Sequence, residues 1–576
     1  MKNTLIAAAA GVVVLALAAQ PALAQQEAPT RGELEGVPPR EVARPSSVQV
    51  SSRGIEAGPC PLADSDVRTT ISRIEFTGPD GSALDPALAA LLMGIAPVEG
   101  EQSIRNVCDL RDQAQGRLRA ARYVASVQIP QQRLDGGALR LEVVSGRIVE
   151  MHVRGNAGPY ENLLKSRIEA LKAVAPLNEA AAERILLLAS DIPGLTVRLG
   201  LSPAGGQPGD LIGELEVSYI PLRLLANVQN YNSPQLGRET GLLHAEFYGL
   251  TGMGDLTSLT FQSTFDFKEQ VIGQLRHSLV LDDSGTTLAL RGTVARSRPD
   301  LDTLDLRTLS LIGGFEVAHP LVRSLNANAS VAGGFEYALQ RTKVYFAGSS
   351  SPLNRDRIAS VYARIGGDAR KTRFDGSPIS SISGELELRK GLDILGATPT
   401  ATIIDGYGPS RFEGSSTATI VRGELEGFVS PAWWAELAVK ARGQWANRPL
   451  LNFDEFAIGN QTIGRGYDPG ANTGDRAIGF TIEPRINFDL RNFGRAQVFG
   501  YYDGVHLRNL DTGSTERKRY IESVGGGLRL SLTSGVRAEV TYTHPLDPPL
   551  LTGTQIKPPA DRVLFSLTVQ LVPFGF

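Results

Sequence analysis

The chain has 576 residues, which is too many for one ordinary hydrophobic core, so two to four domains are expected. Its 58 Lys and Arg residues against 61 Asp and Glu residues give a net charge of −3, which is not the charge of a nucleic-acid-binding protein. The mean hydropathy of −0.08 argues against a helical membrane protein. It still allows a membrane β-barrel, in which apolar and polar residues alternate and average to ordinary values.

The N-terminus carries the pattern of a secretory signal peptide. Residues 1–24 contain Lys2, an apolar run over Leu5–Ala19 and the cleavage pattern Ala22-Leu23-Ala24. We expect cleavage after Ala24 and export to the periplasm of a Gram-negative cell. An uncleaved membrane anchor is the alternative, and the shortness of the apolar run disfavours it.

A Pro-rich linker is expected over residues 25–69, because this stretch is rich in Pro, Ser, Arg and Glu. The chain has two cysteines, Cys60 and Cys108. In an exported chain, two cysteines most economically form one disulfide, and two thiols are too few for a structural zinc site. The sequence therefore predicts a Cys60–Cys108 disulfide.

Residues 70–219 repeat one order of elements, strand, helix, helix, strand, strand, about every 75 residues. Apolar residues at helical spacing mark the helices, and alternating residues mark the strands. In the first repeat, 70–146, a strand around Ile71–Phe76 precedes expected helices and strands at Pro86–Ile95, Ser103–Tyr123, Val124–Ile129 and Ala138–Val144. In the second repeat, 147–219, they are expected at Arg147–Val153, Tyr160–Leu171, Leu177–Leu188, Leu195–Leu201 and Leu211–Tyr219.

From residue 220 to 576 the sequence shows almost no helical pattern. About sixteen alternating segments, each near the ten-residue length of a spanning strand, predict a 16-stranded antiparallel transmembrane β-barrel. They lie at Leu222–Tyr231, Leu242–Leu250, Leu256–Thr264, Val271–Leu281, Thr286–Val294, Leu306–Val317, Leu325–Leu339, Ile358–Ala369, Ile382–Arg389, Ala418–Phe428, Ala435–Trp445, Ala477–Leu490, Ala496–Leu507, Tyr520–Leu532, Arg537–Thr543 and Val563–Leu571.

A soluble all-β sandwich or propeller is the alternative to a barrel, and the signal peptide disfavours it. The last residue, Phe576, also disfavours it, because a terminal aromatic residue is the usual signal for barrel insertion into the outer membrane. Phe576 is out of phase with the alternation of the last segment, and Pro573 is expected to break the strand before it.

The stretch Phe453–Gly470 is rich in glycine and aromatic residues and contains Gly464-Arg465-Gly466-Tyr467. A Gly-X-Gly sequence permits a sharp turn that holds the arginine at its tip. Inside a barrel a guanidinium needs a carboxylate or water, because an unpaired buried charge is costly. The expected partner is Asp503, which precedes Gly504 on the barrel wall. An ordinary hairpin turn with an exposed arginine is the alternative.

These motifs resemble those of the two-partner secretion outer-membrane translocators, of the haemolysin secretion/activation type, within the POTRA-plus-barrel translocase superfamily. In that family Val-Arg-Gly-Tyr or Val-Arg-Gly-Phe lies on a loop inside the lumen, and its arginine pairs with an aspartate of the inner wall. Arg465, Gly466, Tyr467 and Asp503 match this pattern, and Gly464 replaces the usual valine.

Three further stretches resemble the same family. The run from Leu177 to Gly194, which ends in Asp191-Ile192-Pro193-Gly194, is similar to the translocator form of the POTRA domain. Gly252–Asp255 and His319–Ser324 also look like family sequences. Many members have a plug helix near the N-terminus. Pro38-Pro39 would interrupt a long helix, so we expect at most a short plug segment within residues 25–69.

The resemblance implies two POTRA domains, 70–146 and 147–219, followed by an outer-membrane barrel, 220–576. It implies a pore that recognises a partner exoprotein of the adhesin or haemolysin type in the periplasm and translocates it to the cell surface. The POTRA region, 70–219, is expected to bind that substrate. The alternatives are a factor that inserts other barrel proteins and a passive solute porin, which would not need POTRA domains.

Sequence motifs of enzymes are missing. The chain has no G-x-x-x-x-G-K-[ST] loop, no G-x-S-x-G and no H-E-x-x-H, and its six histidines are scattered. We therefore expect no enzyme activity, no nucleotide hydrolysis, no cofactor and no metal. The expected partners are the secreted substrate, outer-membrane lipid and, during biogenesis, the barrel-assembly machinery, with no nucleic acid and a monomeric state.

Overall fold

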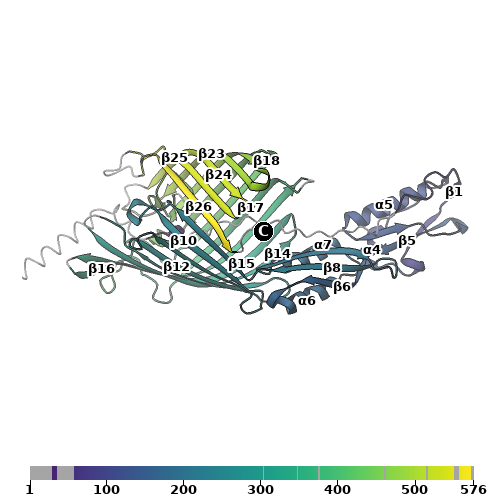
Figure 1. Cartoon of the computed structure of the whole chain (residues 1–576), viewed down its shortest axis with the longest axis horizontal. Coiled ribbons are helices and arrows are strands. Elements are labelled where there is room, and N and C mark those ends of the chain that lie inside the picture. The colour runs from purple at the N-terminus through teal and green to yellow at the C-terminus, as the bar shows by residue number, and fades with distance from the viewer. Residues whose placement is uncertain are drawn as a thin grey trace, which may run out of the picture.

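The computed structural model describes residues 29–34, 58–301, 304–346, 348–373, 376–459, 462–513, 517–549 and 557–572. The predictions for the signal peptide, Pro38-Pro39, Pro573 and Phe576 lie outside the described residues. Figure 1 shows a barrel with two small α+β units that extend from one of its ends as an arm. No helix in the described ranges is long and apolar enough to cross a membrane.

The first α+β unit packs two helices on one face of a three-stranded sheet. The sheet has the order β2-β5-β4, with β2 parallel to β5, and a separate pair joins β1 to β3. Its core includes Leu88, Val107, Leu118, Val127 and Leu141. The elements are β1 (Arg68–Thr70), β2 (Arg73–Thr77), α4 (Pro86–Leu92), β3 (Glu101–Ser103), α5 (Asn106–Ala120), β4 (Ala125–Gln128) and β5 (Ala138–Ser145).

Helix α4 begins and ends where its sequence dictates. The Asp85 side chain accepts a hydrogen bond from the Ala87 N–H at 2.9 Å, and Pro86 occupies the first turn, where its missing N–H costs nothing. The helix stops before Gly94, whose φ of 80° leaves the helical region. It is therefore shorter than the predicted Pro86–Ile95. Helix α5 starts later than predicted because Glu101–Ser103 pairs with β1.

The second α+β unit repeats this arrangement next to the barrel. Its sheet has the order β6-β8-β7, with β6 parallel and β7 antiparallel to β8. Asn178 caps α7, because its side chain accepts hydrogen bonds from the N–H groups of Ala180 and Ala181. The elements are β6 (Arg147–Gly155), α6 (Glu161–Lys172), α7 (Glu179–Ser190), β7 (Leu195–Pro203) and β8 (Asp210–Tyr219), in the predicted order.

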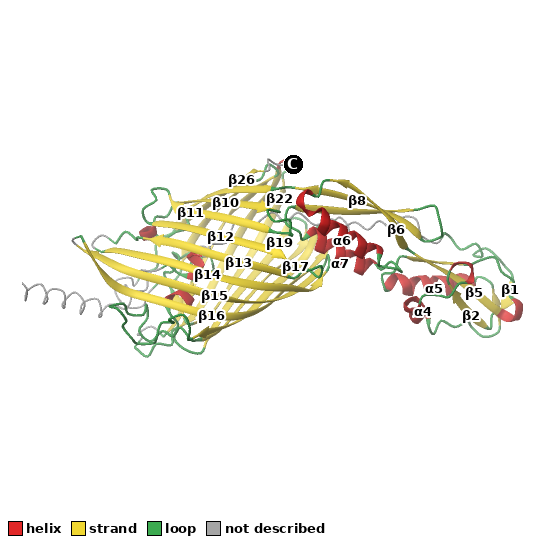
Figure 2. Cartoon of the chain, turned by 90° about the horizontal axis from the view of Figure 1, so that it is seen from below, coloured by secondary structure: helices red, strands yellow, loops and turns green. Residues whose placement is uncertain are grey.

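Sixteen of the remaining strands of the described chain form a closed antiparallel barrel, as predicted. These strands follow one another in sequence around the barrel, as the run from β10 to β16 in Figure 2 shows, and β26 pairs with β9 to close it. They are β9 (Leu222–Gln229), β10 (Thr240–Tyr248), β11 (Leu256–Thr264), β12 (Gln270–Val280), β13 (Thr287–Ser297), β14 (Asp305–Arg323), β15 (Ala327–Phe346), β16 (Ser349–Thr372), β17 (Pro378–Leu392), β18 (Thr419–Ala432), β19 (Ala435–Ala446), β22 (Arg476–Asp489), β23 (Gly494–Arg508), β24 (Lys518–Leu532), β25 (Val536–Pro545) and β26 (Arg562–Val572).

Alternation along each strand separates a polar lumen from an apolar outer face. On β15 the side chains of Glu336 and Gln340 are buried inside, whereas the intervening Tyr337 and Leu339 belong to the outer face. Outside, many large apolar side chains are half-exposed, including Leu243, Leu259 and Val294. This pattern is that of a barrel whose outer wall contacts lipid.

Strands β14, β15 and β16 are longer than the sequence predicts, at 19, 20 and 24 residues. The pairing of β15 with β16 continues to Phe346 and Ser349, next to Gly348 in the turn. The polar run Ser349–Pro352 reads as a loop by composition, yet it lies in a strand because its partner strand extends beside it. Short 3-10 turns lie at Pro79–Gly81, Asp135–Gly137, Gly158–Tyr160, Pro234–Leu236, Asn452–Asp454 and Arg491–Phe493.

Candidate functional site

A long connection between β19 and β22, residues 447–475, folds against the inner wall of the barrel; we call it the lumen loop. It contains a two-stranded pair, β20 (Phe456–Ala457) with β21 (Thr473–Gly474). Apolar side chains bury the loop against the wall: Phe456, Ile458, Ile463 and Tyr467 pack on Ala477, Val505, Leu507 and Ile521. Burial of this apolar surface holds the loop in the lumen.

Arg465 and Asp503 form the pair that the sequence predicts to lie together. The Arg465 backbone N–H donates to Asp503 Oδ2 at 2.9 Å, and its Nε and Nη2 donate to the two carboxylate oxygens at 3.2 Å each. Asp503 is fully buried, and Thr481 donates a further hydrogen bond to it at 2.7 Å. The guanidinium also stacks on the Tyr501 ring, 3.6 Å from its centroid.

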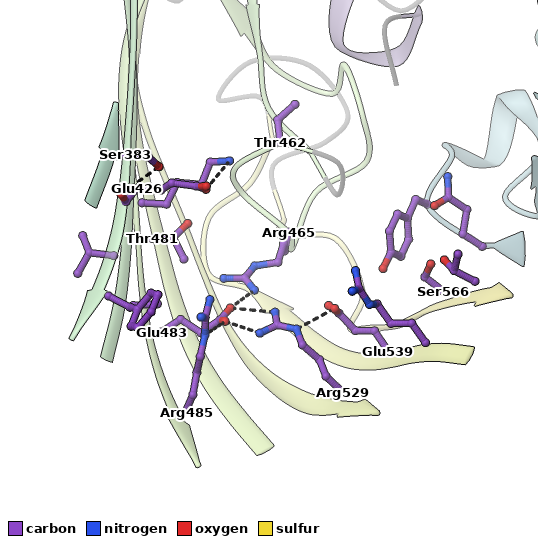
Figure 3. A pocket seen from close by; sticks show the side chains of 18 of the residues that line it. Ser383, Glu426, Thr462, Arg465, Thr481, Glu483, Arg485, Arg529, Glu539 and Ser566 are labelled. Carbon is purple, nitrogen blue, oxygen red and sulfur yellow. Dashed lines mark hydrogen bonds and ion pairs between the residues drawn. The ribbon is translucent and has the colours of Figure 1, made fainter. Parts of the chain in front are cut away.

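Glu483, on β22, is a second carboxylate partner that the sequence analysis missed. It accepts a hydrogen bond from Arg465 Nη1 at 2.6 Å and also binds Arg485 and Arg529, as Figure 3 shows. Arg529 continues the chain of charges to Glu539 at 2.8 Å. The sequence did contain a signal for this partner. Glu483 is a charged residue two positions after Thr481, so it lies on the same, lumen-facing side of β22.

Glycine is needed at each of the two positions beside Arg465, for different reasons. Gly464 has a φ of 85°, a conformation that a valine would rarely adopt. Gly466 has no such backbone conformation, but a Cβ there would lie 2.6 Å from Ser523 Cβ. Its own N–H donates to Ser523 Oγ at 3.2 Å. Gly466 therefore permits the loop to touch the wall.

Tyr467 and Asp468 extend the contact between the lumen loop and the wall. The Tyr467 hydroxyl donates to the carbonyl oxygens of Glu522 and Asp547 at 2.8 and 3.0 Å. Asp468 forms ion pairs with Arg238, at 3.0 Å, and with Arg562. Four consecutive residues of the loop thus contact different parts of the barrel.

Gly504 does not contact the loop, although the sequence groups it with Asp503. It lies on the opposite face of β23, where a Cβ would be 2.9 Å from the Phe480 ring. It therefore makes room for an aromatic side chain of the outer face.

Arg411 joins further loops at the end of the barrel away from the α+β units, and the sequence analysis missed it. It is buried in the connection between β17 and β18, and it donates to Glu455 Oε1 at 2.7 Å and to Asp475 Oδ1 at 2.6 Å. It also pairs with Asp511, in the connection between β23 and β24. The Arg411 guanidinium therefore links three connections: the one that contains Arg411 itself and the two that supply its carboxylate partners.

The second α+β unit is attached to the barrel by the stretches that resemble the family. Arg323, from the end of β14, donates to both oxygens of Asp191 at 2.7 and 2.5 Å. Glu183 accepts the Leu325 N–H at 2.7 Å, and Arg184 donates to the Pro320 carbonyl oxygen at 3.1 Å. These contacts join α7 to the turn that follows β14.

The turn between β10 and β11 and the turn between β12 and β13 complete this junction. The buried Tyr160 hydroxyl donates to the Asp255 carbonyl oxygen at 3.1 Å, and the Tyr219 hydroxyl donates to that of Tyr248 at 2.6 Å. Arg167 donates to the Asp283 carbonyl oxygen. Burial lowers the pKa of the Arg167 guanidinium, and the nearby Asp283 carboxylate partly offsets this.

Cys60 and Cys108 form the predicted disulfide, with 5.9 Å between their Cα atoms. It attaches the end of the linker to α5. Next to it, Arg111 donates to the Gly58 carbonyl oxygen at 3.1 Å. The first α+β unit therefore includes residues that the sequence analysis assigned to the linker.

The lumen below the loop contains a polar cavity of about 630 Å³, lined by Arg465, Glu483, Arg485, Arg529 and neighbouring residues of β9, β17 and β26. Among the described residues, no group of three His, Cys, Asp or Glu side chains is placed to hold a metal ion. The charged lining forms ion pairs across the strands, so the cavity is suited to water and polar groups rather than to an apolar ligand.

Comparison with known structures finds the same fold in two solved structures. CdiB from Escherichia coli is 16% identical, with a TM-score of 0.69 over 96% of this chain and 95% of that one. CdiB from Acinetobacter baumannii is also 16% identical, with a TM-score of 0.64 over 93% of this chain and 95% of that one. A sequence search of curated proteins finds no match.

The family of the chain follows from its sequence between the end of the second α+β unit and β24 of the barrel. Residues 216–530, more than half of the chain, match the family model described as haemolysin secretion/activation protein ShlB/FhaC/HecB. This is a family of transporters, not of enzymes. The chain therefore belongs to the haemolysin secretion/activation protein family and is an outer-membrane β-barrel of the two-partner secretion type.

Proposed function

We propose that the protein recognises one secreted partner, of the adhesin or haemolysin type, and moves it through the barrel lumen to the cell surface without nucleotide hydrolysis. The observation that carries the proposal is the lumen loop, anchored by Arg465 to Asp503 and Glu483 above a charged cavity. A loop held by ion pairs and hydrogen bonds can yield to a polar chain, because water and the chain can replace those bonds.

In this proposal the α+β units are two POTRA domains, 70–146 and 147–219, which receive the unfolded substrate in the periplasm. Their sheets have the orders β2-β5-β4 and β6-β8-β7, so outer strands such as β2 and β6 lie at sheet edges. An extended polypeptide can add to such an edge through main-chain hydrogen bonds. The contacts between α7 and the turn after β14 would then bring the bound chain to the barrel entrance.

The remaining assignments belong to the same proposal. The barrel, 220–576, contacts outer-membrane lipid and acts as a monomer, after insertion by the barrel-assembly machinery with Phe576 as the signal. Residues 1–24 are the signal peptide, and the linker lies within residues 25–69, of which Cys60 and the start of β1 already belong to the first α+β unit. Transport needs no cofactor, metal or enzymatic step, because folding of the substrate outside the cell favours outward movement.

Deletion of the gene tests this proposal against the alternative of a barrel-assembly factor. Proteomes of the culture medium and of the outer membrane would be compared before and after deletion and after complementation. We expect the loss of one large secreted protein, while other outer-membrane barrels stay at normal levels. A general fall in barrel proteins would favour the assembly factor and contradict the proposal.

A further inference from the structure

The outer wall of strands β10–β16, which lie side by side in Figure 2, has a hollow in its apolar band. The hollow has a volume of about 950 Å³, and its lining includes Gly273, Gly292 and Gly313, one outward-facing glycine from each of β12, β13 and β14. Gly292 lies directly opposite Gly313, and a Cβ at Gly292 would meet no heavy atom within 4 Å. The glycines therefore leave the wall open where larger side chains would fill it.

Apolar side chains surround these glycines. Leu259, Leu275 and Val294 line the hollow and are each about half-exposed. Because the same strands span the membrane, the hollow opens toward hydrocarbon rather than toward water. A hydrocarbon chain can fill such a space without leaving a polar group unpaired. The hollow is therefore suited to an acyl chain.

A row of basic side chains lies directly beyond the hollow on the same outer face. Arg296 on β13 and Arg341 on β15 are exposed, and each follows a residue of the hollow by two positions, which is about 7 Å along a strand. Only Leu309 separates Arg296 from Arg341 across the ladder. Arg355 on β16 lies directly opposite Arg341. We call these arginines, with Lys343 and Arg357, the basic row.

The basic row has few acidic partners. Lys343 lies directly opposite Arg307, and Arg357 lies directly opposite Leu339 of the hollow. Like charges that face each other across a sheet are unfavourable, and an anion between them relieves the repulsion. A phosphate is such an anion, and arginine binds it through two parallel hydrogen bonds. Within the part of the chain that the structure describes, no carboxylate forms an ion pair with Arg296, Arg341, Lys343 or Arg357.

The basic row lies at the membrane surface away from the α+β units. Arg323, at the opposite end of β14 from Arg307, contacts the second α+β unit. The Tyr345 ring lies beside the row, with its centroid 3.9 Å from the Arg307 guanidinium. Aromatic residues of membrane barrels gather at the level of the lipid headgroups. Because the α+β units lie in the periplasm, the basic row faces the outer leaflet of the outer membrane.

We propose that the outer wall of β10–β16 carries a binding site for a phosphorylated lipid of the outer leaflet. Its phosphates pair with Arg296, Arg341 and Arg357, and one of its acyl chains lies in the hollow over Gly292. Charge at the membrane surface and an apolar hollow toward the membrane centre match the order of headgroup and chain in such a lipid. The site lies outside the lumen, so it is independent of the proposed transport.

The test measures binding of fluorescently labelled lipid A, with its phosphates present, to the purified full-length protein in detergent by fluorescence anisotropy. Arg296→Ala Arg341→Ala removes two charges from the basic row. The matched control, Arg119→Ala Arg198→Ala, removes two exposed charges from the α+β units. Gly292→Leu fills the hollow, and no neighbouring atom opposes the new side chain at its Cβ. Compact migration in gel electrophoresis checks that every variant is folded.

We expect the wild type and the control variant to bind lipid A saturably and with equal affinity. Arg296→Ala Arg341→Ala and Gly292→Leu should each bind at least tenfold more weakly, and the wild type should bind lipid A without phosphates at least tenfold more weakly. Unchanged affinity in either site variant, or equal binding of the two lipids, would overturn the inference. A dimer that Gly292→Leu dissociates, with lipid affinity unchanged, would also overturn it, because a second copy of the chain would then cover this wall.

Discussion

The Arg465 backbone N–H and its guanidinium both bind the carboxylate of Asp503, at 2.9 and 3.2 Å. Because one carboxylate binds both the main chain and the side chain of Arg465, it fixes the position of the loop tip as well as the direction of its side chain. Asp503 is fully buried and Arg465 nearly so, which makes the pair sensitive to the loss of either partner.

Replacing Arg465 by Ala should destabilise the barrel by about 3–5 kcal/mol, because the buried Asp503 carboxylate loses its arginine. The measurement is the temperature to which the sample must be heated before the barrel migrates as the unfolded rather than the compact species in gel electrophoresis. Secretion of the partner by the same variant should fall strongly. In this variant Glu483 still binds Arg485 and Arg529. The loss of stability should therefore come mainly from the unpaired Asp503 carboxylate.

The single variants Arg465→Lys and Asp503→Asn provide the comparison for this prediction. Asparagine removes the charge of Asp503, but its side-chain oxygen can still accept the hydrogen bond from the Arg465 N–H. The loss of stability in Asp503→Asn should therefore be smaller than in Arg465→Ala. Unchanged secretion and conductance in both Arg465→Ala and Asp503→Ala would show that the pair has no role in transport.

Gly466→Ala should also disturb the loop, for a steric reason. The added Cβ would lie 2.6 Å from Ser523 Cβ and 3.2 Å from Pro545 Cα, so the loop must move away from the wall. Overpacking of this kind costs about 1–3 kcal/mol. We expect a lower unfolding temperature and altered conductance.

Ser523→Gly relieves part of that clash and is the natural partner variant. The double variant Gly466→Ala Ser523→Gly should recover stability relative to Gly466→Ala alone. If Gly466→Ala behaves like the wild type in both assays, close packing at this point is not important for the loop.

The ion pair between Arg323 and Asp191 should couple the second α+β unit to the barrel. Arg323→Ala is expected to reduce secretion while the unfolding temperature of the barrel changes little, since this pair lies at the junction. A partly exposed, bidentate pair contributes about 1 kcal/mol. The measurement is partner secretion at equal amounts of folded protein.

Exchanging the charges tests whether the pair itself matters. The variant with Arg323→Asp and Asp191→Arg should secrete more than either single substitution, as expected for coupled residues. Equal secretion by the double and single variants would show that the two side chains act separately.

Removal of the disulfide should destabilise the first α+β unit alone. The bond joins residues 48 positions apart, and loop entropy predicts a stabilisation of about 4 kcal/mol for a loop of that length. Cys60→Ser Cys108→Ser should therefore increase proteolysis within residues 58–145 and leave the barrel intact. Equal protease resistance with and without the bond would contradict this expectation.

Much of the barrel could be predicted because its strands repeat a local pattern. Alternation placed all sixteen strands, for instance β26, in which Leu567 is half-exposed outside and Ser566 lines the lumen cavity. Strand length was less predictable. Ser349–Pro352 belongs to β16 only because β15 pairs with it, and sequence composition does not carry that information.

The site was predicted where a motif exists and missed where the contacts join distant residues. Arg465 and Asp503 were paired because a guanidinium inside a barrel needs a carboxylate, and the resemblance supported the pair. Glu483 and Arg411 were not found.

Residues 29–34 were covered only by the expectation of a short plug segment somewhere within residues 25–69. The capping pattern Thr30-x-x-Glu33 was present in the sequence. Its place in the lumen depends on the ion pairs of Arg31 with Glu336 and Asp454, more than 300 and 400 positions away.

Passage of a polypeptide through the lumen is the central claim, and site-specific crosslinking tests it most directly. Ser383 lines the lumen cavity, whereas the preceding residue, Ile382, is half-exposed on the outer face. A photoreactive amino acid would replace each residue in turn in cells that are secreting. We predict a crosslink to an exported polypeptide from position 383 and none from position 382. Crosslinks from neither position, or equally from both, would contradict transport through the lumen.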